Sequence, residues 1–315
     1  MTDPLQNLKA IGLVILGFGM FAVNDSIIKY LAQHFTISQT LFWTSLFVGV
    51  ILLAYIFINK GPAAFKTTLW SWHLVRGLCI TGLVFCNIYA LTQIKLTDFY
   101  AIVFTTPLSM ALIARVALKD ELTLPQFMAI CAGFLVVLYM CRPGSELFDI
   151  GAVFAAFGTL FLVTASLLVR SKLKDEDPLL LGVTGPATLG VIALAVAIGY
   201  AVYLPQEKPF VLPEGIDWGI FLLSGLSSAI ANVVFIAGFQ KASSAAVAAP
   251  FHYTQMIWGA VLGYLIFEEI PSTNVVIGSI ALAVLGTYLI MSESRNRKQK
   301  MLKTQNENLQ IHEFT

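Results

Sequence analysis

The sequence predicts an all-α integral membrane protein with ten transmembrane helices, built as two five-helix repeats of inverted topology. The first observation is composition. Of 315 residues, 57% are hydrophobic and 12% are charged, with a mean hydropathy of +0.80, whereas a soluble domain is about 25% charged. The second is a series of apolar stretches, each long enough to cross about 30 Å of hydrocarbon. The third is an internal repeat that relates the two halves.

The apolar stretches define the expected spans, and the short connections between them hold many of the Pro, Gly and charged residues. The ten spans are expected near residues 10–32, 38–59, 72–94, 97–118, 124–142, 149–170, 178–203, 217–240, 243–267 and 273–292. The polar segment 293–315 is expected to be a cytoplasmic tail.

The distribution of positive charge predicts the orientation. If the N-terminus is cytoplasmic, most of the 19 Lys and Arg residues fall at cytoplasmic ends of spans. The positive-inside rule therefore predicts a multi-pass protein with both termini in the cytoplasm. The membrane that we expect is the plasma membrane, which is the inner membrane of a bacterium.

Two pairs of segments carry the internal repeat. IGLVILGFG at 11–19 matches IGAVFAAFG at 150–158, and LVRGL at 74–78 matches LLSGL at 222–226. The second match has an offset of 148 residues, which continues through the fourth and ninth spans. Because five spans per half is an odd number, the halves enter the membrane from opposite sides. Such inverted repeats are typical of alternating-access transporters, with the substrate site between the halves near the membrane midplane.

Composition and motifs argue against several classes of function. A net charge of +1 provides no basic field for nucleic acid. The four cysteines lie in apolar runs without metal-ligand spacing, and the chain has neither an HExxH nor a GxSxG motif. We therefore expect no metal, no cofactor and no enzyme activity. The chain also has no Walker A motif, which favours a secondary transporter.

The chain resembles the drug/metabolite transporter superfamily, in its ten-span branch built from two EamA domains. The segments that carry the resemblance are NDSIIKYL at 24–31, TTPLSMALIARVALKDELTLPQ at 105–126 and APFHYTQMIWGAVLGYLIFEEIPS at 249–272. The resemblance covers about residues 10–292, with repeats expected at 10–143 and 149–292. Within the superfamily the chain is most similar to the S-adenosylmethionine uptake branch, and the riboflavin uptake branch shares part of the pattern. At His252 and Gln255 the S-adenosylmethionine branch carries oppositely charged residues instead.

Asp25 is the foremost candidate functional residue. Of the 18 acidic residues it alone lies well inside an expected span, and an ionised Asp at the bilayer centre costs about 2.5–3.5 kcal/mol on insertion scales. We expect it to line a central cavity and to meet a cationic group of the solute or a coupling proton. The alternative is a structural pair with Lys29, four positions on and on the same helix face. Asn24 is expected to contact the solute or to hold helices together.

The ninth span combines polar and aromatic side chains. Its expected solute contacts are Phe251, His252, Tyr253, Gln255 and Trp258. Aromatic faces with interleaved polar groups suit a flat ring such as adenine or flavin, although an aromatic stripe can equally serve helix packing.

Further candidates come from other spans. The remaining expected solute contacts are Lys29, Asn87, Tyr100, Phe104 and Asn232. Phe104 corresponds to His252 under the 148-residue offset. Pro107 removes a backbone hydrogen bond, which leaves a carbonyl to meet a ligand or a neighbour.

Several residues near the span ends are expected to have structural roles only. Arg76 and Arg115 are expected to snorkel from cytoplasmic span ends toward water. Trp43, Trp72 and Trp218 are expected to lie in aromatic belts at the membrane interfaces.

The leading hypothesis is secondary transport, and the resemblance implies uptake of S-adenosylmethionine or its exchange for S-adenosylhomocysteine. Riboflavin uptake and export of amino acids or other metabolites are alternatives of the same class, and riboflavin has no cation to meet Asp25. A channel or an intramembrane enzyme is the alternative of a different class. The expected partners are the small-molecule solute and the lipid bilayer, without nucleic acid, for a chain that acts as a monomer.

Overall fold

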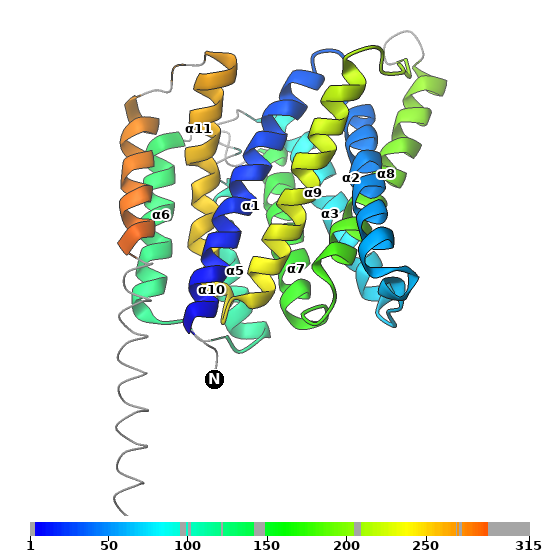
Figure 1. The fold of residues 1–315 in the computed structure, drawn as a ribbon. Helices are drawn as coiled ribbons and strands as arrows, with labels where there is room; N and C mark the ends of the chain where they lie inside the picture. The colour runs from blue at the N-terminus through cyan, green and yellow to red at the C-terminus, as the bar shows by residue number, and fades with distance from the viewer. Residues whose placement is uncertain are drawn as a thin grey trace, which may run out of the picture.

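Every regular element that the computed structural model describes is a helix (Figure 1). The described residues are 4–94, 99, 102–120, 122–141, 149–204, 209–268, 270 and 273–288.

The helices are numbered as in Figure 1. They are α1 (Pro4–Leu31), α2 (Ile37–Lys60), α3 (Trp70–Gln93), α5 (Thr106–Ala117), α6 (Leu124–Cys141), α7 (Ile150–Ser171), α8 (Pro178–Tyr203), α9 (Asp217–Lys241), α10 (Ala245–Ala248), α11 (Thr254–Phe267), the 3₁₀ helices η1 (Pro62–Phe65) and η3 (Ala249–Tyr253), and a further helix at Thr273–Tyr288. Within the described residues, six helices are long and apolar enough to cross a membrane: α1, α2, α3, α7, α8 and α9.

Side-chain caps define where several of these helices begin. Thr36, Asp149 and Asp177 each accept a hydrogen bond from a backbone N–H in the first turn of the helix that follows, which satisfies a donor that has no partner inside the helix. Gly61 ends α2 with φ +69°, a backbone conformation that side chains with a Cβ rarely adopt. The polar residues of the connections thus set the helix boundaries.

Helices from the two halves of the chain lie side by side. α1 packs along α9, α3 along α7, and α2 along α8; Figure 1 shows the α1–α9 pair at the front of the molecule. A Cβ added to Gly238 of α9 would lie 2.9 Å from Cγ2 of Val14 and 3.0 Å from the carbonyl oxygen of Ala10. Small residues at such contacts let membrane helices approach closely. The two halves are therefore tightly packed against each other.

The ninth expected span is not one uniform α-helix. The sequence predicts a single helix over 243–267, but α10, η3 and α11 divide this stretch. Pro250 lies in η3, and because proline lacks an N–H it removes one α-helical hydrogen bond and favours the tighter 3₁₀ turn.

The fourth expected span has a related local structure. α5 begins at Thr106 and α11 begins at Thr254, which are equivalent under the 148-residue offset. Each threonine hydroxyl donates to the carbonyl three residues earlier, Thr106 to Val103 and Thr254 to Phe251. Pro107 was expected to leave the carbonyl of Val103 without a hydrogen bond. That carbonyl instead accepts the hydrogen bond from the Thr106 hydroxyl.

The bundle has two ends that are held by different kinds of contact. The start end is the end of the bundle at which α1 begins, at Pro4. The finish end is the end at which α1 stops, at Leu31. The ends of α2, α7 and α9 and the beginnings of α3 and α8 also lie at the start end. The hydrogen bonds that show this are Asn7–Ser243, Gln240–Leu173, Lys60–Asp177 and Thr67–Glu176.

Candidate functional site

Asp25 lies on the face of α1 that contacts α11. It follows Phe18 by seven positions, about two turns, so the two side chains share a helix face. Asp25 Oδ2 accepts a hydrogen bond from Gln255 Nε2 at 3.1 Å. The expected alternative, an ion pair with Lys29, is not formed by these two described residues. An ionisable group inside a span thus has a polar partner on another helix, as such groups generally do.

The Asp25 face of α1 is covered in the part nearer the start end and exposed in the part nearer the finish end. Val14 and Phe18 are 0% and 5% exposed, whereas Asp25 and Lys29, further along the same face, are exposed. The two apolar positions of this face are therefore covered, and the two charged positions are not.

His252 lies beside the closed part of this face. Its ring is 4.6 Å from the ring of Phe18 and 6.0 Å from that of Phe104. The side chain is 7% exposed, and the imidazole has no hydrogen-bond partner among the described residues. A buried polar group without a partner is costly. The two residues related by the 148-residue offset, Phe104 and His252, are therefore in contact where the halves meet.

Trp258 covers α1 next to the site. A Cβ added to Gly19 would lie 3.2 Å from Cε2 and Nε1 of the indole, so only glycine lets the ring lie this close to α1. The tryptophan remains 40% exposed. Trp258 and His252 thus provide aromatic surface along the stretch of α1 that precedes Asp25, and Gln255 provides the hydrogen bond to the carboxylate.

Two other candidates of the ninth span are in apolar packing. Phe251 is 1% exposed, in a cluster with Phe18 and Phe239. Tyr253 is 2% exposed, and its hydroxyl donates to the carbonyl oxygen of Ile130 at 3.2 Å. Their surroundings favour a packing role.

Asn24 joins three helices. Its Oδ1 accepts from Ser224 Oγ at 2.9 Å, and Ser224 is 2.9 Å from Thr44 Oγ1. Asn24 is 6% exposed, which favours the helix-joining role among its two expected roles. Asn232 donates from Nδ2 to the carbonyl oxygen of Ser228, one turn back in α9, at 2.9 Å.

Asn87 lies where α3 meets α7. A Cβ added to Gly158 would lie 2.2 Å from Asn87 Oδ1, and that oxygen is buried without a hydrogen-bond partner. The remaining candidate, Tyr100, lies outside the described residues. In the part of the chain that is described, no three His, Cys, Asp or Glu side chains gather as metal ligands would.

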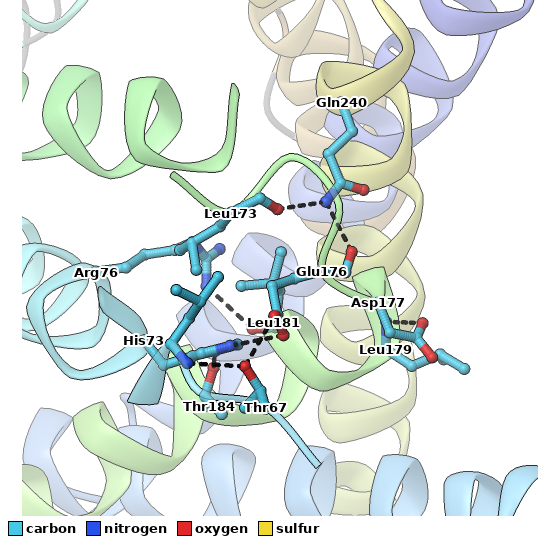
Figure 2. Close-up of polar contacts among 11 residues, drawn as sticks. Thr67, His73, Arg76, Leu173, Glu176, Asp177, Leu179, Leu181, Thr184 and Gln240 are labelled. Carbon is cyan, nitrogen blue, oxygen red and sulfur yellow. Dashed lines mark hydrogen bonds and ion pairs between the residues drawn. The ribbon is translucent and has the colours of Figure 1, made fainter. Parts of the chain in front are cut away.

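A polar network at the start end was missed by the sequence reasoning. Figure 2 shows His73 between Thr184 and Glu176. The distances are 3.0 Å from Nδ1 to Thr184 Oγ1 and 3.1 Å from Nε2 to Glu176 Oε2. Glu176 also accepts from Thr67 Oγ1 at 2.8 Å. The signal in the sequence was a histidine near the beginning of an apolar span, opposite an acidic loop.

Arg76 does not snorkel. It is 4% exposed, and its Nη1 donates to the carbonyl oxygen of Leu181 at 3.0 Å (Figure 2). The expectation was wrong because α8 covers this side of α3, so the guanidinium lies between helices.

A second polar group closes the start end near the N-terminus. Arg170 Nη2 lies 3.0 Å from Asp120 Oδ2, and Arg170 Nη1 donates to the carbonyl oxygen of Ala242 at 2.6 Å. Asp120 also accepts from the backbone N–H of Ala245 at 2.8 Å. These contacts tie α7 to the connections that precede α6 and α10.

The finish end is closed by aromatic packing instead. Trp43 is 8% exposed, with its ring 5.1 Å from Trp218 and 6.4 Å from Phe221. The expectation that Trp43 lies in an interface belt was wrong, because aromatic residues of α9 and of the segment before it cover the indole.

Comparison with known proteins identifies relatives over nearly the whole chain. The model of the EamA-like transporter family matches residues 8–142 and 149–292. An S-adenosylmethionine uptake transporter of Rickettsia felis is 21% identical, over 95% of this chain and 99% of its own length. A riboflavin transporter of Rhizobium johnstonii is 25% identical, over 92% of this chain and 93% of its own length. The pseudopaline exporter CntI of Pseudomonas aeruginosa is 22% identical, over 86% of this chain and 92% of its own length. A solved structure described as "Crystal structure of protein" has the same fold, with a TM-score of 0.70 and 16% identity over 94% of this chain and 99% of that one.

Proposed function

The chain belongs to the EamA-like transporter family, and we propose that it is a secondary transporter that moves a small organic metabolite by alternating access. The predicted family is confirmed, and the chain is an integral membrane transporter. The finer statements of solute, topology and orientation are proposals.

We propose that ten spans form two repeats of inverted topology, at 10–143 and 149–292. The proposal is supported by the two segments that the family model matches. It is also supported by the pairing of α1 with α9 and of α3 with α7, because exchanging the halves converts one pair into the other. The equivalent hydroxyl bonds of Thr106 and Thr254 agree with it.

We further propose that the start end faces the cytoplasm. The excess of Lys and Arg at this end supports that orientation. The exposed part of the Asp25 face then lies toward the outer side of the membrane.

The observation that carries the proposed solute is the contact between Asp25 and Gln255 across α1 and α11. An accessible carboxylate inside a span suits a cationic solute group. S-adenosylmethionine has a sulfonium and an ammonium group, and its adenine ring fits an aromatic surface such as that of Trp258. Uptake of this solute, or its exchange for S-adenosylhomocysteine, is therefore the preferred assignment.

Riboflavin uptake is the second candidate. The exposed indole of Trp258 favours it, since a flavin ring needs stacking surfaces and few charges. Riboflavin has no cation for Asp25.

The test is counterflow of labelled S-adenosylmethionine into proteoliposomes that contain the purified protein or its Asp25→Asn variant. We expect saturable uptake that S-adenosylhomocysteine inhibits and that Asp25→Asn reduces at least about tenfold, as expected when a charged hydrogen bond is lost. Asp175→Asn, an exposed loop position, is the matched control and should transport normally. Uptake of riboflavin but not of S-adenosylmethionine by folded protein would favour the second candidate.

A further inference from the structure

Arg76 is a buried cation without an acidic partner. It lies in α3, is 4% exposed, and uses Nη1 to donate to the carbonyl oxygen of Leu181. Its Nε is buried and has no hydrogen-bond partner. Arginine cannot lose its proton in a protein, so burial does not remove the charge, and a buried charge is stable only when another group compensates it.

Glu176, an acidic residue of the polar network in Figure 2, already has hydrogen bonds to other side chains. One carboxylate oxygen accepts from Thr67, and the other lies 3.1 Å from His73 Nε2. Within the described residues the ion pairs are Lys60–Asp177, His73–Glu176 and Arg170–Asp120. The Arg76 charge is therefore not compensated by an acidic side chain of the described chain.

The fold makes room for this guanidinium. A Cβ added to Gly185 would lie 2.9 Å from Arg76 Nη1, and Pro186, the next residue, lies inside α8. Glycine provides the space, and one N–H holds the group against α8. The other edge of the guanidinium, formed by Nε and Nη2, has the fork geometry that binds both oxygens of a carboxylate.

Arg76 lies on the protein-facing side of α3. Leu78, which projects from the other side of the helix, is 49% exposed. Asn87 follows Arg76 by eleven positions, about three turns, so it shares the Arg76 face. Asn87 also has a buried oxygen without a partner. Arg76 and Asn87, on one face of α3, therefore each have a buried polar atom without a hydrogen-bond partner among the described residues.

We propose that Arg76 binds the carboxylate group of the transported solute through its Nε–Nη2 edge. This inference rests on the proposed function. The contact forms when the start end opens, because Nε is enclosed in the present conformation. Asp25 lies toward the finish end and Arg76 toward the start end, so each meets its group of the solute at a different stage of transport, and Arg76 receives the carboxylate as the solute moves toward the start end.

The test compares S-adenosylmethionine with decarboxylated S-adenosylmethionine, which retains the sulfonium, an amine and the adenine. Counterflow is measured for the unmodified protein, Arg76→Gln and Arg76→Lys. Arg115→Gln is the matched control, since Arg115 is exposed. We expect Arg76→Gln to lower transport efficiency for S-adenosylmethionine about 10- to 100-fold, the range for hydrogen bonds to charged groups. Transport of the decarboxylated solute should change little, and Arg76→Lys should recover part of the loss.

Equal losses for both solutes in folded Arg76→Gln would overturn the carboxylate assignment and leave Arg76 as a structural residue.

A readout that does not depend on the solute separates failure of this inference from failure of the proposed function. The melting temperature of the purified protein is compared in sodium acetate and in sodium chloride of equal ionic strength. Stabilisation by acetate that Arg76→Gln loses supports a carboxylate site, whatever the solute. Equal stabilisation of both proteins contradicts it.

Discussion

The two ends of the bundle are closed by different kinds of contact. At the start end, His73 of α3 bonds to Thr184 and Glu176. At the finish end, the equivalent position under the 148-residue offset is Phe221 of α9, which is 0% exposed and packs against Phe35 and Trp43. The start end is held by hydrogen bonds and ion pairs, and the finish end mainly by aromatic surface, beside the hydrogen bonds of Gln39 with Pro209 and Val211.

This difference has a physical consequence for a transporter. Hydrogen bonds and ion pairs are directional, so the start end opens only when several bonds break together, and each group left unbonded in a buried place costs about 1–3 kcal/mol. Aromatic contacts are less directional and change gradually with separation. The two ends of a pseudo-symmetric protein therefore need not open with the same energy or respond equally to salt.

The largest expected effect is at Arg170. Replacement by Met removes the donors to Ala242 and Ser243 and leaves the Asp120 carboxylate without its cation. Removing one member of a largely buried ion pair costs about 3–5 kcal/mol, measured as the free energy of unfolding in mixed detergent micelles. Arg115→Met, at an exposed arginine with one long hydrogen bond of 3.4 Å, is the control. Equal effects of the two variants would refute a polar closure at the start end.

An exchange of equivalent residues tests the comparison directly. His73→Phe removes the bonds of the imidazole to Glu176 and Thr184, and Phe221→His places a polar ring among aromatics, so each should cost about 2 kcal/mol in the same unfolding measurement. The controls are alanine at Leu74 and Leu222, also equivalent positions, which are 55% and 47% exposed. If the double exchange left stability unchanged, the two ends would be interchangeable and the proposed distinction between them would fail.

The smallest expected effect is at Lys60, which pairs with Asp177 near the surface, with exposures of 43% and 25%. Exposed ion pairs contribute about 0–1 kcal/mol and are screened by salt. Lys60→Met should therefore change the free energy of unfolding by less than about 1 kcal/mol, and by nothing measurable in 1 M salt. A loss as large as that for Arg170→Met would show that exposure does not decide which start-end contacts are strong.

Much of the candidate site was predictable from local sequence. Asp25 stood out as an acid inside an apolar span, and Gln255 and His252 as polar groups inside another. Their contacts could not be predicted: Asp25 was expected to pair with Lys29 if it paired at all, but its partner is Gln255. Helix spacing identifies neighbours on the same helix and is silent about which other helix approaches.

The sequence by itself determined that this chain is a helical membrane protein of a transporter family with an acid in its first span, because hydropathy, charge distribution and motif spacing are properties of local composition. Only the tertiary structure decided that Arg76 and Trp43 are buried and that His73 and Glu176 belong to one network. The physical reason is that an amphipathic side chain near the end of a span can face water, lipid or protein. Which one it faces depends on the helix that packs over it.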